Sequence, residues 1–363
     1  NKFVEIFSAE SENYRRESLG LTKVDALFSP AISFLIGMST VICVYVGGQE
    51  IIAGKITAGN ITEFIMYVFM LTWPLTALGW TSGQIQRAAA SQKRINEFLK
   101  IKTDIVSTEN KKTELKGRIS FKNVSFTYPD TGIEALKNVS FEINEGESIA
   151  IIGSTGSGKS TIANLLLRMY DVSAGKVLFD GFEIQALNIS HFRNQMAYVP
   201  QDVFLFSETI KNNIQFGING ISDEEIYESA RKAVIYDNIM DFEEGFETKI
   251  GERGITLSGG QKQRISIARA IIRNPKILVL DDCLSAVDTN TENAILNNLK
   301  EIMKDKTTFL ISHRVSNARL ADKIIVLDEG RVVETGTHEE LLISAGMYRD
   351  LYEKQNYSEI IES

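Results

Sequence analysis

Two long uncharged stretches near the amino terminus stand out in the pattern of apolar and polar positions. Residues 26–48 and residues 64–86 each contain no Asp, Glu, Lys or Arg over 23 positions. An α-helix needs roughly 20 apolar residues to cross a bilayer core of about 30 Å. A pair of buried core helices is disfavoured, because the two runs stand side by side in an otherwise evenly charged chain. We therefore predict that residues 1–100 form a membrane part with two spans, at about 24–48 and 61–84.

The charges around these stretches predict their orientation. The connector between them has a single basic residue, Lys55, whereas several basic residues flank the outer sides: Lys2, Arg15, Arg16, Lys23, Arg87, Lys93, Arg94, Lys100 and Lys102. Basic flanks remain in the cytoplasm. We expect a multi-pass protein of the plasma membrane in contact with lipid, with the connector outside and everything after Arg87 in the cytoplasm.

The pattern changes after a polar linker at residues 101–117. Residues 119–124 and 139–143 alternate between apolar and polar side chains, which predicts half-buried strands of a small antiparallel β-subdomain. Short apolar runs at 148–152, 276–280, 307–311 and 323–327 are separated by segments with helical spacing. This alternation predicts an α/β domain, residues 118–352, with a parallel sheet flanked by helices and a polar tail at 353–363.

A glycine-rich segment follows the first of these buried runs. It reads Gly153-Ser154-Thr155-Gly156-Ser157-Gly158-Lys159-Ser160, with Thr161 next, and it fits the P-loop pattern between a strand and a helix. Backbone N–H groups of such a loop close around phosphate oxygens, and the helix end favours the anion. Lys159 would bridge the β- and γ-phosphates and Ser160 would coordinate Mg²⁺. The segment predicts a bound nucleoside triphosphate but no particular reaction.

Two carboxylates end the apolar run at 277–280. Ligands of open α/β sheets bind at the carboxyl ends of the strands. Asp281 would hold Mg²⁺ through water, and Asp282 would sit where a general base can polarise the attacking water. A helix-capping pair is the alternative, which the P-loop disfavours.

A second glycine-rich segment that could bind phosphate occurs at residues 257–261. Ser258 can cap the helix that starts near Gln261, and Gly259 and Gly260 expose backbone N–H groups to an anion. Taken alone, the segment is equally typical of an ordinary capped helix. Because one ATP already fills the P-loop, a second phosphate-binding segment implies a partner subunit.

These motifs, in their order, are similar to one family. Residues 118 to about 350 resemble the nucleotide-binding domain of ATP-binding-cassette (ABC) transporters, which implies a P-loop NTPase fold with a helical subdomain. By this resemblance Gly153–Thr161 match Walker A, Ile277–Asp281 match Walker B, and Leu257–Gln261 match the signature motif unchanged. The cofactors implied are ATP and Mg²⁺.

The resemblance also assigns roles to single residues. Tyr128 is similar to the aromatic residue that stacks on adenine, and Gln201 to the glutamine that senses Mg²⁺ and water. His313 is similar to the switch histidine near the γ-phosphate. Ser285 to Asp288 resemble the D-loop, and Glu252-Arg253-Gly254 resemble a loop that contacts the membrane domain.

Residues 1–100 resemble the last two spans of an exporter-type membrane domain fused ahead of its ATPase. The resemblance implies a half-transporter in which two ATP molecules lie between the P-loop of one subunit and the signature of the other. Two spans cannot enclose a pathway, so we expect the N-terminus to be truncated. The cargo stays open among small molecules, lipids and peptides.

One residue departs from the family pattern. The position after Walker B is usually glutamate, and here it is Asp282. The aspartate carboxylate falls back by roughly 1.5 Å, which predicts ATP binding with slow turnover. We expect a heterodimer in which this signature completes the partner's competent site, with a homodimer as the other possibility. A regulatory ATP-binding subunit with little turnover is the alternative function. A P-loop GTPase or kinase is disfavoured, because neither class needs the signature.

The net charge and the two cysteines bear on the binding partners and on the redox compartment. The formal net charge is −8 with no basic domain, so a nucleic-acid partner is not expected. Cys43 lies inside the first apolar run and Cys283 follows the acidic pair. Neither suggests a disulfide framework, which fits a reducing compartment.

Overall fold

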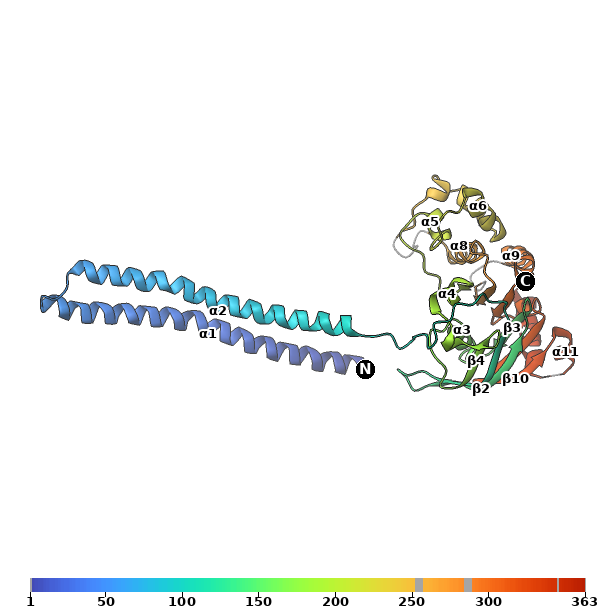
Figure 1. Cartoon of the computed structure of the whole chain (residues 1–363), viewed down its shortest axis with the longest axis horizontal. Coiled ribbons are helices and arrows are strands. Elements are labelled where there is room, and N and C mark those ends of the chain that lie inside the picture. Colours follow the sequence, from blue (N-terminus) through green and yellow to red (C-terminus); the bar gives the residue numbers. More distant parts are fainter. Residues whose placement is uncertain (1, 252–256, 284–288, 345, 363) are drawn as a thin grey trace. The chain divides into compact units, whose positions relative to one another are not determined.

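The computed structural model describes residues 2–251, 257–283, 289–344 and 346–362. Its chain divides into two compact units, Asn1–Lys102 and Thr103–Ser363 (Figure 1). Each unit has its own architecture.

Two long helices make up the first unit, α1 (Lys2–Ile52) and α2 (Ala58–Lys100), joined by a short turn. Figure 1 shows them running alongside each other in opposite directions. Asn60 accepts a hydrogen bond from the Thr57 backbone N–H (3.0 Å), which caps α2. Both helices are long and apolar enough to cross a membrane, and they extend beyond the predicted spans because the charged flanks continue the helices.

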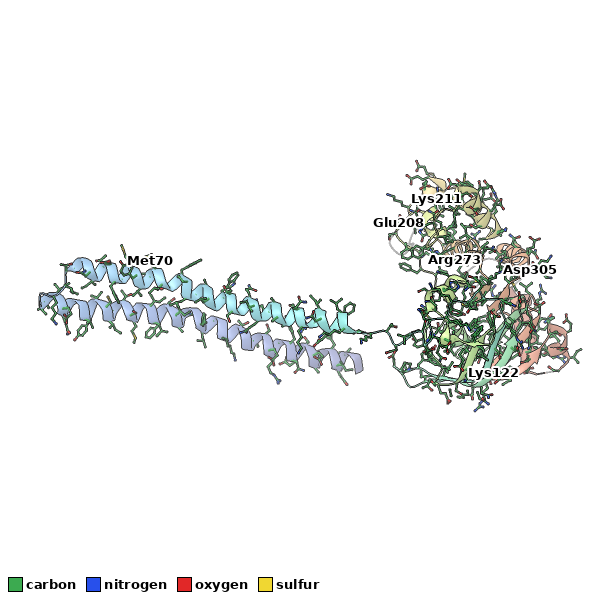
Figure 2. The ribbon with its side chains drawn as sticks, viewed as in Figure 1. Met70, Lys122, Glu208, Lys211, Arg273 and Asp305 are labelled. Carbon is green, nitrogen blue, oxygen red and sulfur yellow. The ribbon has the colours of Figure 1, made fainter. Side chains whose placement is uncertain are left out.

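Most large apolar side chains of these helices are exposed. Met70, labelled in Figure 2, is 70% exposed, and the surfaces of Phe34 and Trp73 are similarly open. Exposed apolar surface on this scale is stable against lipid or other apolar helices, not against water. The first unit therefore has the composition of a membrane domain.

The second unit contains two sheets. The four-stranded sheet has the order β2-β1-β4-β5 and is antiparallel, as the alternation at 119–124 and 139–143 predicts. The six-stranded sheet has the order β10-β9-β3-β8-β7-β6; it is parallel except for β10, which pairs antiparallel with β9. The strands are β1 (Ile119–Thr127), β2 (Glu134–Ile143), β3 (Ser148–Gly153), β4 (Ala174–Phe179), β5 (Phe182–Glu183), β6 (Met196–Val199), β7 (Ile277–Asp281), β8 (Thr307–Ile311), β9 (Lys323–Asp328) and β10 (Arg331–Gly336).

Helices cover both faces of the parallel sheet. Alternate side chains of each central strand pack into two separate cores, because successive residues of a strand point to opposite faces. Ile151, Val279 and Phe309 face α3 and the antiparallel sheet, whereas Ile152 and Leu280 face the other helices. The helices are α3 (Lys159–Leu166), α4 (Ile189–Asn194), α5 (Ile210–Ile214), α6 (Asp223–Lys232), α7 (Tyr236–Met240), α8 (Gly259–Ile271), α9 (Thr289–Met303), α10 (Val315–Ala318), α11 (His338–Ile343) and α12 (Met347–Glu362), with 3-10 turns η1 (Ile184–Ala186) and η2 (Gly245–Glu247).

A group of helices, α5 to α8, forms the helical part of this unit between β6 and β7. The α6 helix is stabilised locally: Ser222 and Glu225 form a capping box, and acidic residues fill its first turn. Lys211 of α5, labelled in Figure 2, forms an ion pair with Asp223 at 2.7 Å. This arrangement agrees with the helical subdomain implied by the resemblance.

The ends of the predicted domain are more ordered than the sequence suggests. In the expected linker, the Leu115 backbone N–H donates to Gln195 Oε1 (2.7 Å), and Arg168 donates to the Val106 carbonyl (2.7 Å). Residues 103–117 therefore belong to the second unit. Likewise, α12 continues through the expected polar tail, where Gln355 contacts the segment after β8.

Candidate ATP site

A cleft of about 960 Å³ opens at one edge of the parallel sheet. Its lining comes from segments far apart in the chain: Tyr128, Ile133, Glu134, Ala135, Lys137, Thr155, Gly156, Gly158, Lys159, Ser160, Thr161, Gln201, Asp282, His313, Glu329 and Gly330. Parallel strands place their carboxyl ends at the same edge. The loops after β3, β6, β7 and β8 therefore deliver the P-loop, Gln201, Asp282 and His313 to one place.

The P-loop closes on itself around the ammonium group of Lys159. Lys159 Nζ donates to the carbonyls of Gly153 (2.9 Å) and Ser154 (2.8 Å). Gly158 precedes α3 with φ +102°, and a Cβ there would lie 2.6 Å from the Ala135 carbonyl oxygen. Ser157 Oγ is a buried polar atom without a hydrogen-bond partner in the described part of the chain. The loop thus gathers donor groups at the N-terminal end of α3, where an anion is favoured.

The charge of Lys159 depends strongly on this environment. Burial lowers the pKa of Lys159 to about 8, and the carboxylates of Asp282 and Asp281 only partly oppose this effect. An anionic ligand would favour the protonated form. The P-loop lysine is therefore still mostly protonated at pH 7, although by a smaller margin than an exposed lysine, and a bound phosphate would hold it in the charged form.

The acidic pair behaves as two different groups. Asp281 is buried, and its Oδ1 accepts a hydrogen bond from Ser160 Oγ (3.3 Å) and its Oδ2 one from the Tyr198 hydroxyl (3.3 Å). Burial raises the pKa of Asp281, and the two hydroxyl groups lower it in part. Asp282 lies in the cleft with φ +45°, and its backbone N–H donates to the Ile311 carbonyl (2.8 Å).

His313 and Gln201 line the cleft beside this pair. Burial, followed by the charge of Lys159, lowers the pKa of His313, so its imidazole is neutral at pH 7. Gln355 of α12 holds the His313 segment in place: its Nε2 donates to the His313 carbonyl (2.6 Å), and its Oε1 accepts from the Val315 N–H (2.7 Å).

Tyr128 lies at the far end of the cleft. Its hydroxyl is 3.0 Å from Thr161 Oγ1, at the start of α3. Its ring packs edge-on against Phe126 and Tyr170, with centroids 4.8 and 5.4 Å apart. An aromatic ring fixed in this way can present a face to a flat ligand such as a base.

The second glycine-rich segment, residues 257–261, does not line this cleft. Ser258 and Gln261 form a capping box at the start of α8: the Gln261 N–H donates to Ser258 Oγ (3.2 Å), and the Ser258 N–H donates to Gln261 Oε1 (3.0 Å). Ser258 and Gly259 are exposed, and Gly260 is half-buried. Among the described residues that line the ATP cleft, none comes from this segment. The predicted D-loop through Asp288 and the segment 252–254 lie outside the described residues.

The residues fit Mg²⁺ bound together with a nucleotide. A hydroxyl (Ser160), a carboxylate (Asp281) and a side-chain amide (Gln201) are the hard oxygen ligands that this ion prefers. Within the described ranges there is no cluster of three His, Cys, Asp or Glu side chains that could hold a metal alone. Substrate phosphates would have to complete the coordination, as is usual for Mg²⁺.

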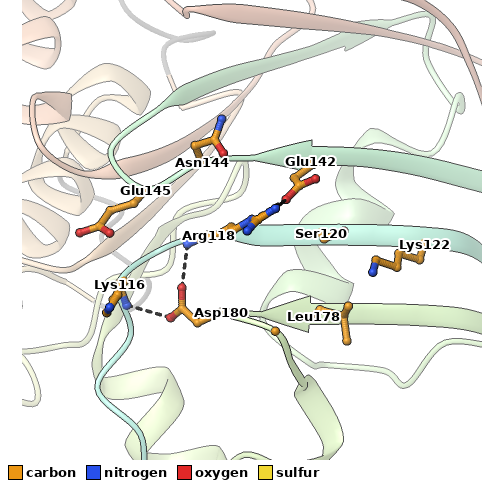
Figure 3. Close-up of a pocket in the computed structure, with 10 residues that line it drawn as sticks. Lys116, Arg118, Ser120, Lys122, Glu142, Asn144, Glu145, Leu178 and Asp180 are labelled. Atoms are coloured by element: carbon orange, nitrogen blue, oxygen red, sulfur yellow. Dashed lines mark hydrogen bonds and ion pairs between the residues drawn. The ribbon is translucent and has the colours of Figure 1, made fainter.

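Another hollow, of about 590 Å³, lies on the outer face of the antiparallel sheet (Figure 3). Some of its charged groups pair with one another or with the backbone. Arg118 forms an ion pair with Glu142, and Asp180 accepts hydrogen bonds from the backbone N–H groups of Lys116 (2.8 Å) and Arg118 (3.0 Å). None of the described residues that line this hollow is a predicted site residue.

Two family models match separate parts of the chain. The model described as "ABC transporter" matches residues 136–285, and the one described as "ABC transporter transmembrane region" matches residues 1–75. Together they cover more than half of the chain in the predicted order. The chain belongs to the ABC transporter family. The similarity confirms the predicted fold class and the fusion of a helical membrane domain to a nucleotide-binding domain.

Curated relatives show the same fused organisation. The chain is 41% identical over 351 residues to "Probable multidrug resistance ABC transporter ATP-binding/permease protein YheI" of Bacillus subtilis, covering 96% of this chain and 60% of the relative. It is 38% identical to "Multidrug resistance-like ATP-binding protein MdlA" of Escherichia coli (96% and 59%) and 38% identical to an "ATP-dependent lipid A-core flippase" of Photobacterium profundum (96% and 60%). The chain thus spans about three fifths of the length of these relatives.

A solved structure is similar in fold as well. It is a bacterial Atm1-family ABC exporter with ATP bound, with a TM-score of 0.76 and 36% identity, over 89% of this chain and 56% of that chain.

Several residues of the ABC transporter site escaped sequence reasoning. Glu329 and Gly330 reach the cleft through the β9–β10 turn, where the Gly330 N–H donates to the Ser157 carbonyl (3.2 Å). Gln355 and Tyr198 act on site residues from a distant helix and a neighbouring strand. Only for Tyr198 was there a usable signal, because it lies three residues before Gln201 in a short buried run.

Proposed function

We propose that this chain is the ATP-binding and ATP-hydrolysing subunit of an ABC exporter. The observation that carries the proposal is the convergence of Tyr128, the P-loop, Gln201, Asp282 and His313 in one cleft. Two helices long and apolar enough to span a membrane, and relatives named as multidrug resistance or flippase proteins, support a link to transport. We place the nucleotide-binding domain in the cytoplasm, because it follows the basic flank of the second span in the sequence.

Each side chain of the cleft has a role in this proposal. Tyr128 stacks on adenine, and the P-loop N–H groups and Lys159 hold the phosphates. Mg²⁺ bound with ATP supplies neutralisation of the phosphate charge. Asp282 accepts the proton of the attacking water, and Gln201 orients that water. His313, neutral at pH 7, donates a hydrogen bond to the γ-phosphate.

We further propose that turnover at this site is slow. Asp282 carries its carboxylate roughly 1.5 Å short of the usual glutamate, and a misplacement of about 1 Å can cost on the order of 10²-fold in rate. The exposed Ser258–Gly259 end of α8 does not contribute to this chain's own cleft, so it is free to complete the site of a second subunit. A heterodimer with a faster partner site is favoured, and a homodimer is the second arrangement.

A regulatory subunit that binds ATP without productive turnover is the second candidate function. Asp282 is the observation that favours it. Transport into sealed vesicles distinguishes the two functions, since an exporter subunit requires ATP for accumulation and a sensor does not. The relatives' names suggest drug-like or lipid cargo as the first classes to assay.

The proposal is tested by nucleotide binding to the purified protein. We expect a fluorescent ATP analogue to bind, Lys159→Ala to abolish binding at micromolar nucleotide, and Tyr128→Ala to weaken it by about 1–3 kcal/mol, the worth of base stacking. Tyr227→Ala, in the helical part, is the control. Equal binding by the wild type and the Lys159 variant would refute the site.

A further inference from the structure

Strands β6 and β7 are neighbours in the parallel sheet, and their register brings Tyr198 toward Asp281. Tyr198 pairs with Val279, and Asp281 lies two residues further along β7. Residues two apart share a face, so Tyr198 and Asp281 stand diagonally on the same side of the sheet. The Tyr198 hydroxyl crosses this diagonal and donates to Asp281 Oδ2 at 3.3 Å.

This contact completes a clamp on the buried carboxylate. Ser160, at the start of α3, donates to Oδ1 from the other side at 3.3 Å. Asp281 itself is only 3% exposed. Two hydroxyl groups from different elements therefore hold the two oxygens of one carboxylate, which fixes its rotamer.

The ring of Tyr198 has a different environment from its hydroxyl. Tyr198 lines a cavity of about 230 Å³ together with Leu167, Met169, Arg193 and Arg269. A phenylalanine ring would fill this wall equally well. Packing therefore accounts for an aromatic residue at this position, and only the bond to Asp281 accounts for the hydroxyl.

Burial, together with the neighbouring Asp281, raises the pKa of Tyr198 above that of an exposed phenol, so the hydroxyl is a neutral donor at pH 7 and does not bind Mg²⁺ as an anion. It can orient a carboxylate that does. Hydrogen bonds to metal-binding carboxylates set their direction and basicity, and Mg²⁺ tolerates little departure from octahedral geometry.

We propose that Tyr198 is a positioning residue, whose hydroxyl aims the Asp281 carboxylate and thereby sets the affinity of the nucleotide site for its divalent cation. The inference rests on the proposed ATP site and adds a residue to it. It predicts that removal of the Tyr198 hydroxyl weakens Mg²⁺ binding and leaves Mg²⁺-independent nucleotide binding unchanged.

The test uses Tyr198→Phe in the full chain, purified in detergent, with Tyr227→Phe as a matched control. Tyr227 is half-buried and packs its ring against Tyr236 and Phe246 in the helical part. A fluorescent ATP analogue is titrated first in EDTA, and then Mg²⁺ is titrated at fixed nucleotide. The affinity of free ATP for Mg²⁺ is common to all samples, so differences between variants report the protein.

We expect Tyr198→Phe to raise the half-saturating Mg²⁺ concentration about tenfold, within the range for loss of an outer hydrogen bond. Binding in EDTA should match that of the wild type, whereas the melting temperature should fall slightly, because one oxygen of the buried Asp281 carboxylate loses its hydrogen-bond donor. An unchanged Mg²⁺ requirement, or equal weakening with and without Mg²⁺, would overturn the inference and leave the ATP site standing. If the wild type binds no nucleotide under either condition, the proposed function fails and this inference fails with it.

Discussion

Replacement of Asp282 by glutamate tests the slow-site proposal through a gain of function. The substitution extends the carboxylate by one methylene, roughly 1.5 Å. Since about 1 Å of misplacement can cost on the order of 10²-fold, we expect turnover to rise by about 10- to 100-fold, or about 1.4–2.7 kcal/mol in activation free energy.

The backbone at this position predicts a second, opposite effect. Asp282 has φ +45°, a left-handed conformation that aspartate tolerates better than glutamate. We expect Asp282→Glu to lower stability by about 1 kcal/mol, or about 2–4 °C in melting temperature for a domain of this size. Higher activity together with lower stability is a combination that a general improvement in folding cannot produce.

The assay is steady-state ATP hydrolysis in nanodiscs, with a partner subunit that carries alanine at its position equivalent to Asp282. Asp282→Asn serves as the control, because it keeps the size of the side chain and removes the base; we expect its turnover to fall below that of the wild type. The Michaelis constant for ATP should change little in either variant. Turnover of Asp282→Glu equal to or below that of the wild type, with normal ATP binding, would contradict the slow-site proposal.

Three other perturbations follow from the geometry. Burial lowers the pKa of Lys159 to about 8, so the protonated fraction of its side chain falls above pH 8 and the ATP affinity measured by calorimetry should decrease from pH 7 to pH 9. The same group should raise the free energy of unfolding of the nucleotide-free protein between pH 8 and the ordinary lysine pKa, because there the unfolded chain binds the proton and the folded chain does not. A pH-independent ATP affinity would contradict this prediction. Gly158→Ala should lower the melting temperature far more than Gly181→Ala. Both glycines have positive φ, but only a Cβ at Gly158 would meet the backbone, 2.6 Å from a carbonyl oxygen. Equal decreases in melting temperature would show that the positive φ alone decides the cost. Gln355→Ala should reduce kcat by about 3- to 10-fold with little change in KM, because it frees the segment that carries His313; a change in KM alone would point to another role.

The sequence predicted the fold well where local patterns decide it. The uncharged runs at 26–48 and 64–86 correspond to α1 and α2, and the short apolar runs correspond to β3, β7, β8 and β9. The antiparallel pairing of β10 was not foreseen, because its alternating surface looks the same in either direction.

The cleft was predictable only in part. A motif that is contiguous in sequence, such as the P-loop, can be recognised from its residues alone. Residues that come together only because two distant elements are neighbours in the fold cannot be recognised in this way. Tyr198 reaches Asp281 because β6 and β7 are adjacent, and Gln355 reaches the His313 segment because α12 packs back onto the domain. Neither adjacency is written in the local pattern around those residues.

The measurement that bears most directly on the account compares two equivalent variants in the assembled transporter. The chain is co-expressed with its partner half-transporter, and Asp282→Ala is set against the same change at the partner's equivalent carboxylate. We predict that the partner's change abolishes most ATP hydrolysis and transport, while Asp282→Ala leaves most of both. Equal losses from the two variants would contradict the claim that this chain holds the slow site and completes the faster one.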